Sequence, residues 1–196
     1  MSPTLAAISF YVDQFYRYPL TQELAFTTIR DSLSTGQMKS KVGIVNFCKN
    51  QKIRSEKAVF VAHWHSLLAL MMHNEGIVQT AMGVEKSQLW SDFSNYLNRD
   101  WSWKGENSDI IDFKIPPDTD LVVNTSCEHM SALWLKQIPK GCRVLLQSTN
   151  FEHLEHINKK ESLEDFKTSL VDIDITSMLE INCDVYSRYT VFGIKK

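Results

Sequence analysis

The sequence lacks three features that would assign it to particular classes. It has no long hydrophobic run: the longest, Leu67 to Met72, is far shorter than the roughly 20 apolar residues that span a bilayer. No basic segment precedes an apolar stretch at the N-terminus. The four cysteines form no C-x-x-C pair, which argues against a zinc knuckle or a redox motif. We therefore expect a soluble, cytoplasmic chain with reduced thiols, no leader and no membrane partner.

A strong charge of either sign is also missing. The formal net charge is −2 and the isoelectric point is about 6.3, so no basic field attracts nucleic acid. Trp101, Trp103 and Lys104 form an aromatic and basic patch that could stack on bases, but the charge balance favours packing of these tryptophans in a loop or an interface. Apolar surface around Trp90, Trp101 and Trp103 suits a homo-oligomer. We expect a small-molecule partner.

Hydrophobic residues make up 43% of the 196 residues, which is enough to fill a core. Residues 1–56 show helical spacing of apolar side chains, with Thr21 and Glu23 as a helix-start signature. We predict that this region is a helical extension or lid. Residues 57–196 are predicted to form the main domain.

The main domain begins with alternating strand and helix signals. Ala58 to Ala62 is a short apolar run typical of a strand buried on both faces, and a helix at Leu67 to Met72 follows it. Ile77 to Val84 and Gln88 to Leu97 repeat the pair. Further strands are predicted at residues 108–113, 120–124 and 143–147, with a helix at 130–137. This alternation predicts parallel crossovers and a doubly wound sheet.

The C-terminal part departs from this alternation. A short helix is predicted at residues 162–167, then strands at 171–181 and 186–194. The link between the two strands is too short for a helical crossover, so they should form an antiparallel hairpin. The predicted fold class is therefore α/β, with a mostly parallel sheet, a C-terminal hairpin and an N-terminal helical extension.

Strand-helix units closed by an antiparallel hairpin resemble the Rossmann-like class I S-adenosylmethionine-dependent methyltransferases. In that family a glycine-rich loop after the first strand lets the backbone approach the cofactor. Here the loop Ala62 to Ser66 reads A-H-W-H-S and contains no glycine. It is similar to a degenerate G-G-W-Y-G loop in which only Trp64 is retained. The resemblance implies S-adenosylmethionine as the cofactor, with Ala62, His63 and Trp64 beside it.

The resemblance also implies two acidic cofactor contacts. Glu85, at the end of the second strand, stands where the family holds the ribose hydroxyls, since a carboxylate accepts two hydrogen bonds from a diol. A solvated glutamate at a strand end is the alternative. Asp109 resembles the acidic residue near the adenine, and Asp112 is an alternative for that role.

The most distinctive string of the chain is Asn124 to His129, N-T-S-C-E-H. It resembles a segment of one branch of these methyltransferases and follows a buried strand, at the sheet edge where ligands bind in open α/β folds. We predict catalytic roles for Asn124, Glu128 and His129, with Glu128 or His129 as the base. The alternative is that Asn124 and Ser126 cap the next helix and that His129 packs on it.

Polar residues elsewhere are candidates for binding the acceptor. The N-terminal helices resemble the extension over the substrate side of small-molecule methyltransferases, and Gln37 and Lys41 lie in their most motif-like string. Gln147 and Asn150 follow the fifth strand and would share the edge of the sheet with the N-T-S-C-E-H segment. For both pairs a solvated surface is the alternative.

Three hypotheses follow for the function. The first is an S-adenosylmethionine-dependent methyltransferase acting on a small molecule. The second keeps the fold without the activity, as a binding or scaffold protein with a decayed cofactor loop. In the third, side chains after strands one and four converge on a metal such as zinc, with candidate ligands His63, His65, Cys127, Glu128 and His129. We expect no metal, because such spacings arise often by chance.

Overall fold

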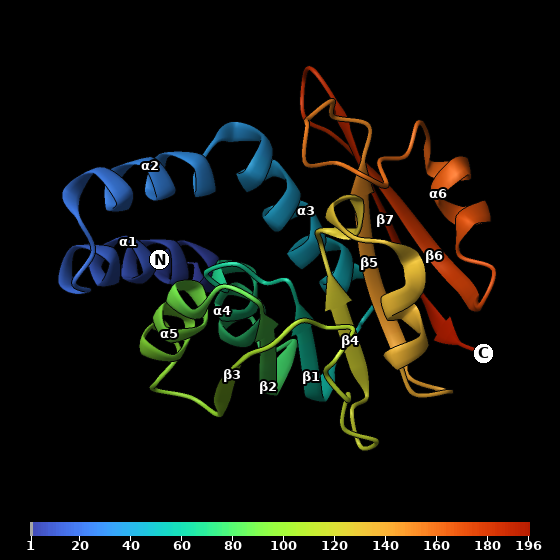
Figure 1. Ribbon diagram of the computed structural model, residues 1–196, viewed down its shortest axis with the longest axis horizontal. Coiled ribbons are helices and arrows are strands. Elements are labelled where there is room, and N and C mark those ends of the chain that lie inside the picture. The colour runs from blue at the N-terminus through green and yellow to red at the C-terminus, as the bar shows by residue number, and fades with distance from the viewer. Residues whose placement is uncertain (1) are drawn as a thin grey trace.

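The computed structural model describes residues 2–196 and contains one seven-stranded sheet in the order β3-β2-β1-β4-β5-β7-β6 (Figure 1). Strand β7 is antiparallel to β5 and β6, and the remaining neighbours are parallel. This confirms the predicted fold class, including its terminal hairpin. The strands are β1 Ser55–Val61, β2 Val78–Glu85, β3 Trp103–Asn107, β4 Leu121–Asn124, β5 Arg143–Thr149, β6 Ile173–Asn182 and β7 Ser187–Lys195.

Helices cover both faces of the sheet because the central strands are apolar on both sides. In β1, Ala58 and Phe60 belong to one buried cluster, whereas Val59 and Val61 belong to the other, as the two-residue period of a strand requires. The first cluster packs under α1 Pro3–Arg17, α3 Thr35–Asn50, α4 Leu67–Asn74 and α5 Gln88–Leu97, and the second under the 3₁₀ helix η2 Ala132–Gln137 and α6 Leu163–Ser169.

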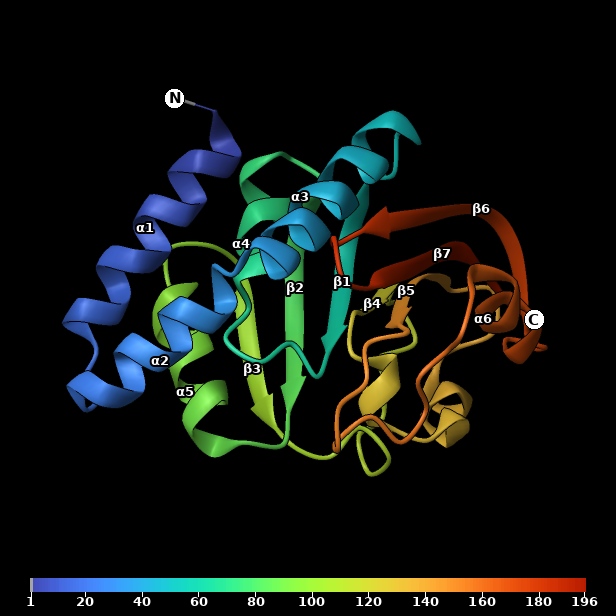
Figure 2. The same ribbon diagram turned by 90° about the horizontal axis from the view of Figure 1, so that it is seen from above.

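The N-terminal helices share a hydrophobic cluster with the sheet. Helices α1 and α2 Gln22–Ser32 lie side by side at the end of the molecule opposite α6 (Figures 1 and 2). Tyr11 and Phe15 of α1 are buried and their rings contact Phe93 of α5. Helix α3 then reaches toward β6, where Gly43 lies against the side chain of Ile181 (Figure 2). The division of the chain at residues 56 and 57 stays a prediction.

Two predicted elements are wrong. Residues 108–113 form a turn, and the third strand is β3, Trp103–Asn107. Of the two alternatives expected for Trp103, a loop or an interface, this rules out the loop. Strand β3 is at the sheet edge and its sequence W-K-G-E-N lacks an apolar run, so only its pairing with β2 reveals it. The predicted helix at 130–137 is replaced by η1 Cys127–His129 and η2, because the extended backbone of Met130 (φ −139°, ψ 154°) separates them.

The carboxyl ends of β1, β2 and β4 lie at one edge of the sheet, and the strand order reverses between β1 and β4. In open α/β sheets this switch point is where ligands bind. Across residues 2–196, no helix has both the length and the apolar composition needed to cross a membrane.

A partly buried carboxylate, that of Glu75, attaches α1 to the end of α4. Oε1 of Glu75 accepts hydrogen bonds from the backbone N (3.1 Å) and Oγ1 (2.6 Å) of Thr4, and Oε2 accepts one from Lys49 Nζ (2.7 Å). The hydrogen bond from Lys49, and then the one from Thr4, lower the pKa of Glu75.

We expect Glu75→Gln to lower the free energy of unfolding by about 1 kcal/mol at pH 7. Because the folded pKa is depressed, the difference should disappear as the pH falls through it, which urea titrations at pH 7 and pH 3 measure. A difference that persists at pH 3 would contradict the charged interaction.

Candidate functional site

Two adjoining cavities lie at the switch point of the sheet. The larger has a volume of about 660 Å³ and the smaller about 330 Å³, both within the range of small-molecule sites. Their walls share Val61, Ala62, Glu85, Lys86 and His129. The two cavities therefore adjoin at the carboxyl ends of β1 and β2.

The loop after β1 has the backbone of a glycine loop without the glycines. Ala62, Trp64 and Ser66 have φ values of 48°, 53° and 59°, in the left-handed region that L-residues adopt at a cost of about 1–2 kcal/mol each. Tyr11 of α1 supports this loop, because its hydroxyl hydrogen-bonds Nδ1 of His65 at 2.9 Å. The absence of glycine weakened the cofactor prediction at the sequence level. The tertiary structure nevertheless imposes a conformation in which the backbone can approach a ligand.

This strain leads to a prediction for Ala62. Ala62→Gly removes the left-handed penalty but adds the backbone entropy of glycine, so we expect the free energy of unfolding to rise by about 0.5 kcal/mol. The control Ala25→Gly, inside the regular helix α2, should lower it by about 1 kcal/mol. Paired urea denaturations measure both, and a loss of stability in both variants would show that residue 62 is unstrained.

Glu85 lies where the two cavities meet. Its Oε2 accepts the backbone N–H of Trp64 at 3.1 Å and its Oε1 accepts that of Ser87 at 3.0 Å. These bonds fix the carboxylate between the loop and α5, while each oxygen keeps a lone pair for another donor. Burial raises the pKa of Glu85, against these backbone hydrogen bonds. Such a carboxylate can accept two further hydrogen bonds.

The smaller cavity contains the acidic residue predicted beside the adenine. Asp109 lines this cavity and accepts the N–H of Ile111 on Oδ1 at 3.0 Å. Asp112, the alternative, is absent from its lining. Ile110, Met130 and Trp134 supply an apolar wall. The geometry favours Asp109 over Asp112.

The histidines of the loop after β1 line the larger cavity as neutral groups. Burial lowers the pKa of His63 to about 3 and that of His65 well below its usual value. Among residues 2–196, neither ring nitrogen of His63 has a hydrogen-bond partner. Among the described residues, the group of His, Cys, Asp and Glu side chains close enough to share an ion is Glu128, His129 and His156, and it includes neither these two histidines nor Cys127. The metal set considered from the sequence therefore does not assemble as a whole.

The N-T-S-C-E-H segment divides into a structural part and a cavity-facing part. Asn124 is fully buried, its Oδ1 accepts the N–H of Ser126 at 2.8 Å, and Asn124 is not part of either cavity wall. Glu128 and His129 line the larger cavity. Burial raises the pKa of Glu128 to about 7, although the positive charge of Arg188 acts in the opposite direction. The pKa of His129 is lowered, mainly by burial and then by the nearby imidazole of His156. The catalytic roles stay predictions, and the geometry favours Glu128 and His129 over Asn124.

Of the four residues predicted to bind the acceptor, two line the larger cavity and two do not. Gln37 and Lys41 line the larger cavity, where Lys41 Nζ donates to Gln37 Oε1 at 2.8 Å. Burial, and then the guanidinium of Arg188, lower the pKa of Lys41 to about 7. Gln147 is buried outside the cavity walls, where its amide hydrogen-bonds Ser40 and Thr190, and Asn150 accepts the N–H of Ser187. These two side chains connect structural elements.

Sequence reasoning missed Arg188, a buried cation of β7 that lines the larger cavity. Its Nη1 lies 3.2 Å from Gln147 Oε1 and 3.8 Å from Glu128 Oε1. Residue 188 sits in a strand of the terminal hairpin with no motif around it. Only the pairing of β7 with β5 brings it to the site.

Comparisons with known proteins agree with this architecture. No family model and no curated protein matches the sequence. Among solved structures, an S-adenosylmethionine-dependent methyltransferase from Clostridium acetobutylicum aligns with a TM-score of 0.64 at 13% identity, covering 87% of this chain and 97% of that chain. The N-methyltransferase NodS from Bradyrhizobium japonicum gives 0.64 at 8% identity, with 84% and 99% covered. Geranyl diphosphate C-methyltransferase from Streptomyces coelicolor gives 0.62 at 9%, with 79% and 76% covered.

These similarities, together with the strand order, define the fold class. The chain has the fold of the class I S-adenosylmethionine-dependent methyltransferases, with the antiparallel β6-β7 pair that ends their sheet. At these identities the likeness establishes the fold alone.

Proposed function

We propose that this protein is an S-adenosylmethionine-dependent methyltransferase that acts on a small-molecule acceptor. The position of Glu85 is the observation that carries the proposal. It ends β2 at the junction of the two cavities and is fixed by the backbone of Trp64 and Ser87. A carboxylate at that place suits a ribose diol.

The residues present fit the proposed cofactor. The left-handed loop Ala62 to Ser66 supports the proposal, because it lets main-chain groups approach a ligand in the larger cavity. The apolar wall of the smaller cavity beside Asp109 suits a purine. Bound S-adenosylmethionine would supply an activated methyl group.

The acceptor would lie in the remainder of the larger cavity, which Lys41, Glu128, His129 and Arg188 line. Methyl transfer requires in-line placement of the acceptor. These polar side chains would orient an acceptor. The cavity suits a small molecule, and NodS and the geranyl diphosphate enzyme are N- and C-methyltransferases by name.

The four cysteines are free and buried, which suits a reducing compartment. We therefore extend the proposal to a cytoplasmic location.

Calorimetric titration with S-adenosylhomocysteine tests the proposal, and NADH serves as the control ligand because it binds other doubly wound folds. We expect saturable binding of S-adenosylhomocysteine and none of NADH. Absence of binding at millimolar ligand would reject the methyltransferase and favour the scaffold hypothesis. Transfer of labelled methyl groups to the small-molecule fraction of an extract, rather than to its macromolecules, tests the acceptor class.

A further inference from the structure

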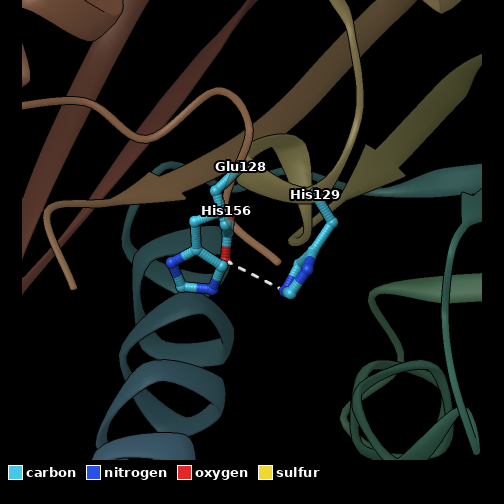
Figure 3. Close-up of side chains that lie close together, drawn as sticks. All are labelled: Glu128, His129 and His156. Carbon is cyan, nitrogen blue, oxygen red and sulfur yellow. Dashed lines mark ion pairs between the residues drawn. The ribbon is translucent and has the colours of Figure 1, made fainter. Parts of the chain in front are cut away.

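We infer that Glu128, His129 and His156 form a binding site for a divalent transition metal ion at the wall of the larger cavity. One ligand atom from each residue lies within 4.8 Å of the others, and no ion is present. Figure 3 shows the three side chains close together, with Glu128 and His129 from η1 and His156 from the loop between β5 and α6. A carboxylate with two imidazoles is a donor set that binds Zn²⁺ and related ions.

One oxygen of the Glu128 carboxylate lacks a hydrogen-bond partner. The residue is only 1% exposed, and within the described chain its Oε2 has no hydrogen-bond donor. Arg188 approaches Oε1 only to 3.8 Å, beyond hydrogen-bond distance. Burying a carboxylate oxygen without a partner is costly. A metal ion would give Oε2 the partner that it lacks.

The two histidines have different environments that both suit metal ligation. Nδ1 of His156 lies 2.7 Å from the carbonyl of Phe151, and because a carbonyl only accepts, Nδ1 carries the proton and Nε2 presents a lone pair. A backbone carbonyl behind the ring is the usual second contact of a metal-binding histidine. Nε2 of His129 lies 4.0 Å from Oε1 of Glu128 (Figure 3). Ligands on one tetrahedral ion are about 3.3 Å apart, so small side-chain rotations would close the site.

The backbone around the three residues is held together without a metal. The N–H of Asn158 donates to the carbonyl of Glu128 at 3.0 Å, and its side-chain amide reaches the carbonyls of Cys127 and Met130. These bonds tie the loop that carries His156 to η1. The site is therefore largely organised before an ion binds, which lowers the entropy cost of binding.

The wall position indicates the role of the ion. Glu128 and His129 line the cavity assigned to the acceptor, so three protein ligands would leave a coordination position open toward it. The ion would hold an anionic oxygen of the acceptor, such as an enolate, phenolate or carboxylate, in place for methyl transfer. This role rests on the proposed function, whereas formation of the metal site does not.

The test uses the full chain after dialysis against a chelator. Calorimetric titration with Zn²⁺ should show one site, and Co²⁺ should give visible absorption bands from nitrogen and oxygen ligation. His129→Ala and His156→Ala should each weaken Zn²⁺ binding by about 100-fold. The matched control is His153→Ala, since His153 is on the same loop, with its ring 5.3 Å from that of His156, but outside the trio. It should bind Zn²⁺ as the unaltered chain does, and circular dichroism checks that every variant is folded.

Any of three results would overturn the metal site. The chain could fail to bind Zn²⁺ stoichiometrically, folded His156→Ala could bind Zn²⁺ with unchanged affinity, or His153→Ala could lose as much Zn²⁺ affinity as His156→Ala. Binding of S-adenosylhomocysteine to the metal-free chain is measured in parallel. Cofactor binding without Zn²⁺ binding refutes the metal site alone, and Zn²⁺ binding without cofactor binding refutes the proposed function alone.

Discussion

Glu85→Gln is expected to weaken the binding of S-adenosylhomocysteine by roughly 10- to 100-fold. The substitution keeps the size of the side chain and one acceptor oxygen, but removes the charge and the second acceptor that a ribose diol needs. A hydrogen bond to a charged group contributes about 1.5–3 kcal/mol, and each 1.4 kcal/mol is tenfold in affinity. Calorimetric titration of both chains measures the change.

The stability of the ligand-free chain separates a binding role of Glu85 from a structural one. Burial raises the pKa of Glu85 in the folded state. Above that pKa the buried charge lowers the free energy of unfolding, and this loss disappears when the pH falls below the pKa that Glu85 has in the unfolded chain. Glutamine can accept only one of the two backbone N–H groups that Glu85 holds, but it also removes the penalty of burying a charge. At pH 7 we therefore expect Glu85→Gln to unfold at about the same urea concentration as the unaltered chain. The control Glu106→Gln, on β3 outside both cavity walls, should leave the affinity unchanged. Loss of stability together with affinity in Glu85→Gln would indicate that Glu85 mainly supports the loop.

Phe93→Ala is expected to lower the free energy of unfolding by about 3–5 kcal/mol, the range for deletion of a buried aromatic ring. Phe93 is fully buried in α5, and its ring centroid lies 4.1 Å from that of Phe15 and 5.1 Å from that of Tyr18. It therefore joins the N-terminal helix to the layer that covers the sheet. In a chain of this length the loss corresponds to a fall in melting temperature of roughly 10 °C.

The exposed aromatic residue Phe26 provides the control. It lies on α2 with 66% of its surface exposed, so Phe26→Ala should change the free energy of unfolding by less than about 0.5 kcal/mol. Thermal and urea denaturation of the two variants measure the difference. A loss near 1 kcal/mol in Phe93→Ala would show that the helical extension is not packed on the main domain through this ring.

The sequence determined most of the fold because its central strands are continuous apolar runs. The strand at residues 58–62 and the helix at 88–97 were recognisable from local pattern alone, and the structure places β1 and α5 there. Edge strand β3 was missed because its stability comes from pairing with β2, which a local pattern does not record. Met130 likewise interrupts a segment whose composition favours a helix.

For the candidate site, the sequence predicted Glu85 and the segment ending in Glu128 and His129 because they stand at the ends of buried strands. Asp109 was predicted at the start of a strand at residues 108–113, and only the structure places it after a strand, β3. Only the tertiary structure added Arg188 and His156, which come from distant segments without a motif. It also decided the conformation of the loop Ala62 to Ser66, which local preference opposes at three positions. The physical reason is that packing of α1 and the carboxylate of Glu85 stabilise a left-handed backbone, and such long-range compensation cannot be read from neighbouring residues.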